Sequence, residues 1–336
     1  MSEALRPSTL GEILDRTAQL YRRNFWMFTG VAALPIGVIF AITAVAVAII
    51  FAIPGIRASS DQFTPIMAVA IILAVVIVIP IYIVAAVFSY AGMTEAAARV
   101  SRGETITIRR ALASVKPRFW RCLGFIFLQG LIAGGLPAGA ATVLIVVLVA
   151  IGAAAGGGGA SIAAGFLAVI VGIVAFVAIV WLMLSFSLGL PACVVENLPP
   201  WDSLMRSWKL SPGTRGRVLL MYLLVFALSI ALSMVAAIPV LIIVGVASAA
   251  GHGQSQMGLL AAEVIRFVVD FLLQVLLAPV SAIALVLFYY DQRIRKEGFD
   301  IEWMMQQAGL AQPTPTAPAP PSAGVSWPVA PPDTVE

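Results

Sequence analysis

The chain has 336 residues, of which 61% are hydrophobic and 11% charged, with a formal net charge of +4 and a mean hydropathy of +1.03. A soluble domain carries about a quarter charged residues, so this composition excludes one and predicts a membrane protein with several spans. The basic pI of 9.3 does not indicate nucleic-acid binding, because the basic residues flank the apolar segments, where lipid headgroups would meet them.

An amphipathic segment at residues 9–26 precedes the first long apolar run. Thr9 and Glu12 have the spacing of a capping box, which predicts that a helix begins near Thr9. Five side chains then recur at helical spacing and share one face. They are Leu10, Ile13, Leu14, Thr17 and Tyr21. We expect this helix to lie on the membrane surface and to lead into a span.

The same pattern returns at residues 107–120 and at residues 200–210. The apolar faces there consist of Ile108, Ala111, Leu112, Val115 and Phe119, and of Trp201, Leu204, Met205 and Trp208. Each of the three segments precedes two long apolar runs. This predicts three repeated units, each with a surface helix and a hairpin of spans, as in the internal repeats of other membrane proteins. The alternative is that unrelated amphipathic helices share the spacing.

Six apolar runs are expected to cross the bilayer as helices. They are residues 27–53, 66–93, 121–151, 162–191, 218–250 and 261–290. The first would be about 40 Å long, enough to cross a hydrocarbon core of roughly 30 Å with some tilt. The predicted fold class is therefore all-α, with six transmembrane helices in three hairpins.

The transmembrane domain is expected to extend over residues 1–310, followed by a tail at residues 311–336. Eight prolines among the last 26 residues, with few side chains to bury, predict that the tail is disordered. The first 25 residues are polar and charged, which does not match a secretory signal peptide.

The basic residues are segregated: all 20 Lys and Arg except Arg57 and Arg266 lie on one side of the predicted topology. The positive-inside rule makes this side cytoplasmic and places both termini there, in a bacterial cell membrane. Aromatic residues that could anchor at the same interface are Tyr21, Trp26, Trp120, Trp201, Trp208, Tyr289 and Tyr290. The candidates for contact with anionic headgroups are Arg22, Arg23, Arg109, Arg110, Lys116, Arg118, Arg206, Lys209, Arg215, Arg217, Arg293, Arg295 and Lys296. The alternative is that these residues only set the topology.

The sequence offers little for catalysis. Its one histidine, His252, lies in a glycine-rich outer loop, and the sequence lacks HExxH, GxSxG and Walker lysine motifs. Cys122 and Cys193 fall at the inner ends of spans without metal-ligand spacing. We expect a non-enzymatic protein with no cofactor, catalytic residue or metal site.

A polar stripe in the sixth span is the candidate pathway for a solute or proton. Its members, at helical spacing, are Glu263, Arg266, Asp270, Gln274 and Ser281. Ionisable groups cost about 2.5–3.5 kcal/mol at mid-bilayer and often mark transport routes. The alternative is a structural pair between Arg266 and Asp270, four residues apart. Asp270 is the acidic member expected to lie deepest.

Three stretches resemble one family. RPSTLGEILDRTAQLYRRNFW (6–26), ENLPPWDSLMRSWKLSPGTRGR (196–217) and FYYDQRIRKEGFDIE (288–302) are similar to the bacterial glycerophosphoryl diester phosphodiesterase membrane domain. The resemblance covers about residues 5–305. It implies a bacterial multi-span domain, named after proteins in which such a domain precedes a soluble phosphodiesterase. Because the Pro/Ala-rich tail contains no such domain, the enzymatic activity is not expected here.

These observations favour a non-enzymatic accessory, scaffold or lipid-interacting module. The expected partners are membrane lipids, with anionic headgroups at the basic side, and a cytosolic or membrane protein, but no nucleic acid. The alternative is a secondary transporter or channel that uses the stripe in the sixth span. A third hypothesis, a membrane-embedded phosphodiesterase, is weak because the sequence shows no group of catalytic residues.

Overall fold

The computed structural model describes residues 8–52, 65–156, 158–249 and 256–298, and these residues form helices joined by turns, without a strand. Six helical segments are long and apolar enough to cross a membrane, which confirms the predicted all-α polytopic fold. They contain α2 (Phe25–Ala52), α4 (Pro65–Ser101), α6 with α7 (Phe119–Gln129 and Leu136–Ala154), α8 (Gly159–Phe186), α11 (Arg215–Ala249) and α12 (Gln256–Glu297). The predicted tail and His252 lie outside the described residues.

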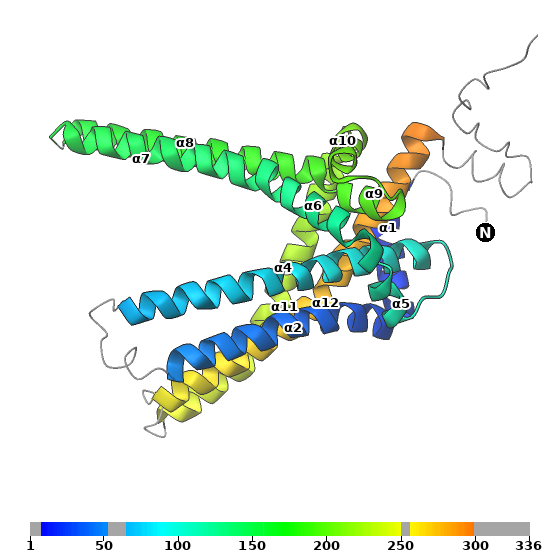
Figure 1. Cartoon of the computed structure of the whole chain (residues 1–336), viewed down its shortest axis with the longest axis horizontal. Helices are drawn as coiled ribbons and strands as arrows, with labels where there is room; N and C mark the ends of the chain where they lie inside the picture. Colours follow the sequence, from blue (N-terminus) through cyan, green and yellow to red (C-terminus); the bar gives the residue numbers. More distant parts are fainter. Residues whose placement is uncertain (1–7, 53–64, 157, 250–255, 299–336) are drawn as a thin grey trace, which may run out of the picture.

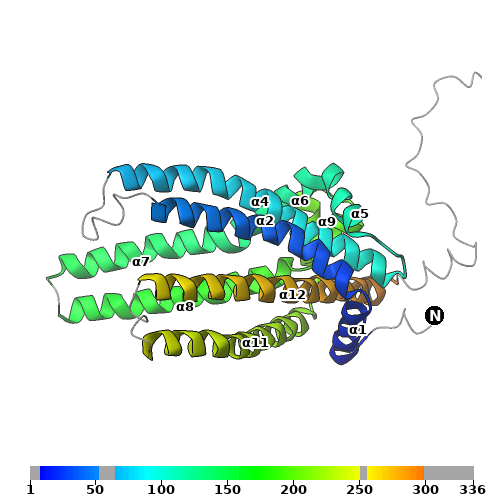
Figure 2. The ribbon, with the colours of Figure 1, turned by 90° about the horizontal axis from the view of Figure 1, so that it is seen from below.

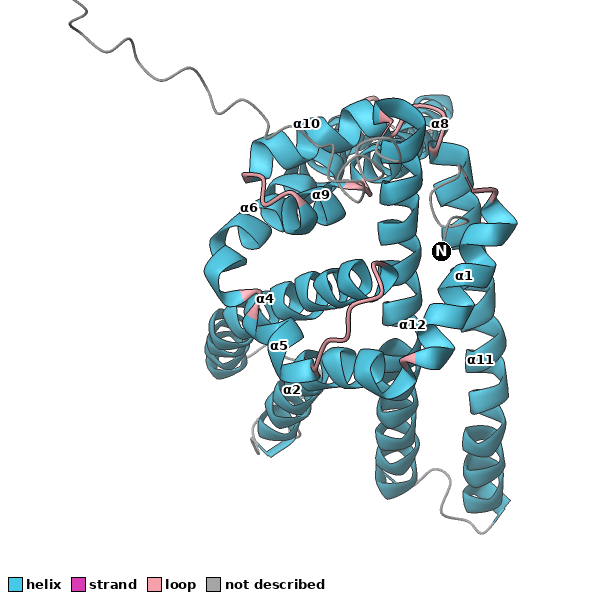
Figure 3. Cartoon of the chain, turned by 90° about the vertical axis from the view of Figure 1, so that its right-hand side faces the viewer, coloured by secondary structure: helices cyan, strands magenta, loops and turns pink. Residues whose placement is uncertain are grey.

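The short helices gather at one end of the molecule, on the right in Figure 1. They are α1 (Leu10–Arg23), α5 (Ile108–Ala113), the 3₁₀ helix η2 (Lys116–Arg118), α9 (Gly189–Val195) and α10 (Pro200–Leu210). We call these helices and the adjoining ends of the spans the basic layer. Figure 3 views this layer end-on, with α12 between α4 and α1.

The helix α1 begins as predicted. The Thr9 amide donates to Glu12 Oε2 at 2.8 Å, and the Glu12 amide donates to Thr9 Oγ1 at 3.3 Å, so both halves of the capping box form. Ile13 and Thr17 on the predicted apolar face are buried against the core. Helix α10 occupies the third predicted segment, residues 200–210.

The second surface helix is much shorter than residues 107–120, so that prediction was wrong in its extent. Helix α5 ends at Ala113, η2 follows, and α6 begins at Phe119. The cause is Pro117, which has no amide hydrogen and whose ring would clash with the Ala113 carbonyl in a continuous α-helix.

The third span also departs from a regular helix. Residues Gly130–Gly135 form a π-helical turn, η3, between α6 and α7. Pro137 lies just inside α7 and cannot donate to the carbonyl of residue 133, so a local change of hydrogen-bond register accommodates it.

The spans pack most tightly near the basic layer. The largest fully buried side chains include Tyr289, Phe28, Phe125, Phe288 and Met93, all in or beside this layer. Further away, α7 and α8 form a hairpin that stands apart from α2, α4 and α12 in Figure 1, and Figure 2 shows the two helices of this hairpin running side by side. Apart from the faces on which α7 and α8 pack together, most of its apolar side chains are exposed, as expected where lipid rather than protein surrounds a helix.

Candidate functional site

A carboxylate lies in the basic layer at the end of each even-numbered span. Glu95 belongs to α4, Glu196 follows α9, and Asp291 belongs to α12; their side chains are 8%, 19% and 2% exposed. Each forms salt bridges with two arginines. We call these groups the three carboxylate nodes, and their recurrence about once per hundred residues supports the predicted threefold repeat.

The Asp291 node joins the start of α1 to the last two spans. Its Oδ2 lies 3.1 Å from Arg217 Nη1 and 2.9 Å from Arg295 Nε. Its Oδ1 accepts a hydrogen bond from the Ser8 amide at 2.7 Å. Both arginines also donate to the Ser8 carbonyl, at 2.6 and 2.8 Å. Because the carboxylate is buried, these charge-assisted bonds compensate for its lost hydration.

The Glu196 node joins α9, α10 and α12. Glu196 Oε1 accepts hydrogen bonds from Arg206 Nη2, at 2.9 Å, and from the Tyr289 hydroxyl. Arg293 Nε lies 3.5 Å from the same oxygen, and Arg206 also pairs with Glu297. Burial opposes the charge on Arg206, but Glu196 and then Glu297 outweigh it and raise the pKa of this guanidinium.

The Glu95 node joins α4, η2 and α9. Arg99 Nε lies 2.7 Å from Glu95 Oε1, and Arg118 Nη1 lies 3.2 Å from Oε2. Arg118 Nη1 also donates to the Val194 carbonyl at 2.9 Å. One arginine therefore connects the second span to the segment after the fourth.

The thirteen residues predicted to contact headgroups differ in whether they have partners within the protein. Five are engaged within the protein: Arg118, Arg206, Arg217, Arg293 and Arg295. Six are exposed, and their side chains have no hydrogen-bond or ion-pair partner among the described residues: Arg22, Arg23, Arg109, Arg110, Lys116 and Lys209. The remaining two make other contacts: Lys296 donates to backbone carbonyls, and Arg215 lies against two tryptophan rings. We call the six exposed residues the outer basic set.

Lys296 caps the C-terminal end of α10. Its Nζ donates to the carbonyls of Lys209, Leu210 and Pro212 at 3.2, 3.1 and 2.9 Å. A cation here satisfies carbonyls that lack helical partners and interacts favourably with the helix dipole. Its three donors are thus engaged by the protein.

Exposed tryptophans accompany the outer basic set. Trp26 and Trp120 each follow a phenylalanine, in the sequences Asn-Phe-Trp and Arg-Phe-Trp. In both pairs the ring centroids are 5.4 Å apart, with interplanar angles of 77° and 78°. Trp201 in α10 is exposed as well. The first two repeated units therefore present the same aromatic pair beside basic residues, an arrangement typical of membrane interfaces.

The polar stripe lies far from this layer. Asp270 and Tyr289 are separated by 19 residues of α12, about 28 Å along a helix, which is close to the thickness of the hydrocarbon core. If Tyr289 lies at one boundary of the core, a helix of this length would place Asp270 near the other boundary. Arg266 Nε lies 3.8 Å from Asp270 Oδ2, and the two side chains are 70% and 57% exposed. Glu263 and Gln274 are also exposed, and Ser281 is half-buried.

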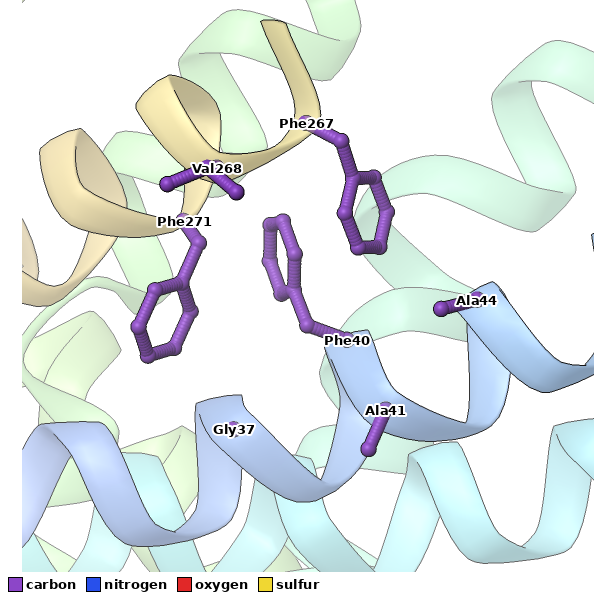
Figure 4. Close-up of a pocket in the computed structure, with 7 residues that line it drawn as sticks. All are labelled: Gly37, Phe40, Ala41, Ala44, Phe267, Val268 and Phe271. Carbon is purple, nitrogen blue, oxygen red and sulfur yellow. The ribbon is translucent and has the colours of Figure 1, made fainter. Parts of the chain in front are cut away.

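An apolar pocket between α2 and α12 contains no member of the stripe. Figure 4 shows Phe40 of α2 between Phe267 and Phe271 of α12. The complete lining is Gly37, Phe40, Ala41, Ala44, Phe267, Val268 and Phe271. These side chains suit hydrocarbon rather than a charged solute.

We expect Asp270→Asn to change the free energy of unfolding by less than about 0.5 kcal/mol, because exposed ion pairs contribute little. Proton flux into liposomes should also equal that of the wild type. Thermal unfolding in detergent and a pH-sensitive dye measure the two quantities. Loss of flux in a stably folded variant would contradict this expectation and support the transporter alternative.

The sequence prediction did not single out the carboxylate nodes. A signal was present for two of them, since Glu95 with Arg99 and Asp291 with Arg295 have the i, i+4 spacing of helical ion pairs. No local pattern indicated Glu196, whose partners lie on other helices.

The two cysteines are both free and buried, Cys122 in α6 and Cys193 in α9. Across the described part of the chain, no three His, Cys, Asp or Glu side chains are grouped closely enough to hold a metal ion.

The model of one protein family, described as a domain of unknown function (DUF7847), matches residues 81–292. The match covers more than half of the chain and includes Glu95, Glu196 and Asp291. Among curated proteins and among solved structures, none matches the chain.

Proposed function

The chain belongs to the DUF7847 family, and we propose that this member is a non-enzymatic module that binds anionic lipid headgroups through its basic layer and serves a partner protein as an accessory or scaffold. Its basic layer faces the cytoplasm of a bacterial cell, in accordance with the positive-inside rule. The resemblance to the glycerophosphoryl diester phosphodiesterase membrane domain stays a prediction, and the enzymatic activity of that name is not part of the proposal.

The outer basic set is the observation that carries the proposal. Its six cations are not needed for the carboxylate nodes, yet they are exposed, and Trp26, Trp120 and Trp201, which belong to the same three segments, are exposed as well. A cation near an anionic membrane surface contributes about 1 kcal/mol to the attraction, and tryptophan favours the same depth. The nodes keep the short helices together and so present these cations on one surface.

The transporter alternative receives less support. A pathway requires ionisable groups that face a cavity or the interior of the bundle. The pair of Arg266 and Asp270 is exposed, and the described apolar pocket offers it no polar lining.

The lipid-binding part can be tested with Arg109→Gln combined with Arg110→Gln. Removing two headgroup contacts should weaken binding of phosphatidylglycerol by about 2 kcal/mol, or roughly 30-fold. Native mass spectrometry of the protein from mixed phosphatidylglycerol and phosphatidylcholine nanodiscs measures the enrichment of the anionic lipid. The matched control is Arg57→Gln combined with Arg266→Gln, which removes the same charge from the opposite side. Equal enrichment in both double variants would refute headgroup binding by these arginines.

The accessory part requires a partner at fixed stoichiometry. We expect native mass spectrometry of protein extracted gently from its own membrane to show one such complex. A lone monomer or homo-oligomer that carries only lipid would eliminate the accessory role.

A further inference from the structure

Arg215, the first residue of α11, holds its guanidinium against two tryptophan rings. Its Cζ lies 4.5 Å from the ring centroid of Trp181 in α8 and 5.4 Å from that of Trp208 in α10. The two rings are themselves edge-to-face, with centroids 5.2 Å apart and an interplanar angle of 85°. Cation–π contact uses the face of a guanidinium, so its N–H donors remain in the plane for another partner.

No acceptor within the described residues takes up those donors. Arg215 forms no hydrogen bond or salt bridge there, and its Nε is buried without a partner. Arg206 Nε is also buried without a partner, but Arg206 and Arg217 both pair with carboxylates through their other donors, whereas Arg215 pairs with none. A buried donor left without an acceptor is unfavourable, so the arrangement indicates a ligand that supplies one.

The immediate surroundings of Arg215 also favour an anion. Thr214 is buried, and its hydroxyl has no hydrogen-bond partner among the described residues. The N-terminus of the long helix α11 adds a partial positive charge and unpaired amide hydrogens. Lys296 is held at the Pro212 carbonyl, two residues before Thr214, and contributes charge although its own donors are engaged.

We propose that Arg215, with Thr214 and the N-terminus of α11, binds a phosphate group, carried by a membrane phospholipid or free in solution. The planar guanidinium can offer two parallel N–H donors to two phosphate oxygens. This inference rests on the proposed lipid-binding function and narrows it to one site.

The position of the site favours a lipid over free phosphate. Trp181 is exposed on α8, and the residues that precede it on that helix, such as Val174 and Val177, are apolar and exposed. An acyl chain attached to the bound phosphate can therefore lie along α8. The tryptophans would cover the glycerol region, where amphipathic rings prefer to lie.

The test compares wild type, Arg215→Gln, Arg215→Lys and the single-charge control Arg266→Gln in detergent, by native mass spectrometry. The probes are short-chain phosphatidylglycerol and, separately, inorganic phosphate. We expect one phosphatidylglycerol per wild-type chain whose binding depends on Arg215, and at least tenfold weaker binding of that lipid in Arg215→Gln. Arg215→Lys should also bind more weakly, because an ammonium keeps the charge but loses the planar pair of donors. Arg266→Gln should equal the wild type.

Each outcome decides a part of the proposal. Arg215-dependent binding of inorganic phosphate without phosphatidylglycerol would support the phosphate site and identify its source as free phosphate. Wild-type affinity for both probes in folded Arg215→Lys and Arg215→Gln would overturn it, and Arg215→Lys alone suffices if the glutamine variant does not fold. If Arg215→Gln loses this lipid while Arg109→Gln combined with Arg110→Gln has no effect, the Arg215 site is supported and headgroup binding by the outer basic set is rejected. If only the Arg109 and Arg110 double variant weakens lipid binding, the outer basic set is supported and the Arg215 site is rejected.

Discussion

Asp291→Ala is expected to lower the free energy of unfolding by about 3 kcal/mol, the largest effect that we expect from any single substitution in this protein's basic layer. The carboxylate is almost fully buried, and its removal leaves Arg217 and Arg295 without their carboxylate partner, so that they keep only the Ser8 carbonyl as an acceptor among the described residues. The Ser8 amide loses its acceptor as well. The expected loss lies at the lower end of the range for buried pairs because the two arginine side chains are 24% and 38% exposed and can gain water.

Thermal or sodium dodecyl sulfate unfolding in mixed micelles, followed by circular dichroism, measures this loss. The matched control is Asp15→Ala in α1, where an exposed aspartate accepts a hydrogen bond from Gln19 in the next turn. That variant should remain within about 0.5 kcal/mol of the wild type. Equal effects in the two variants would show that the Asp291 node does not hold the first helix to the last two spans.

Glu196→Ala is expected to cost about 2 kcal/mol, the second largest effect. It removes the acceptor shared by Arg206, Arg293 and the Tyr289 hydroxyl. The expected loss is smaller than for Asp291 because Arg206 keeps its pair with Glu297. The buried Tyr289 would then hold an unsatisfied hydroxyl, which is costly away from water.

The same unfolding measurement applies, with two comparison variants. Glu196→Gln keeps an acceptor oxygen for Tyr289 and should recover part of the loss, because only the charge pairing is removed. Glu104→Ala removes an exposed pair with Arg102 and should cost no more than about 0.5 kcal/mol. If Glu196→Ala were as mild as Glu104→Ala, the node would contribute nothing beyond an ordinary surface ion pair.

The nodes bear on function because they separate two roles of arginine. In sequence, Arg118 and Arg109 are equivalent basic residues of one loop. In the structure, Arg118 bridges Glu95 and the Val194 carbonyl, whereas Arg109 is exposed. Charge removal at Arg109 should therefore alter lipid binding with little loss of stability, and charge removal at Arg118 should do the reverse.

The amino-acid sequence by itself determined the number of spans, the position of α1 and the separation of basic from apolar segments. These features depend on local composition: an apolar run long enough to cross the bilayer, a capping box at Thr9, and basic residues that flank the runs. The shortened α5 could also have been inferred, because Pro117 interrupts any helix through it.

Only the tertiary structure decided which cations are engaged and which are exposed. Arg217 and Asp291 are 74 residues apart, and Arg118 lies 76 residues from the carbonyl it contacts, so no local pattern relates them. The stack of Arg215 on Trp181 and Trp208 likewise brings together three helices. The physical reason is that membrane insertion depends on local hydrophobicity, whereas the pairing of a charge depends on which distant segments meet where the spans end.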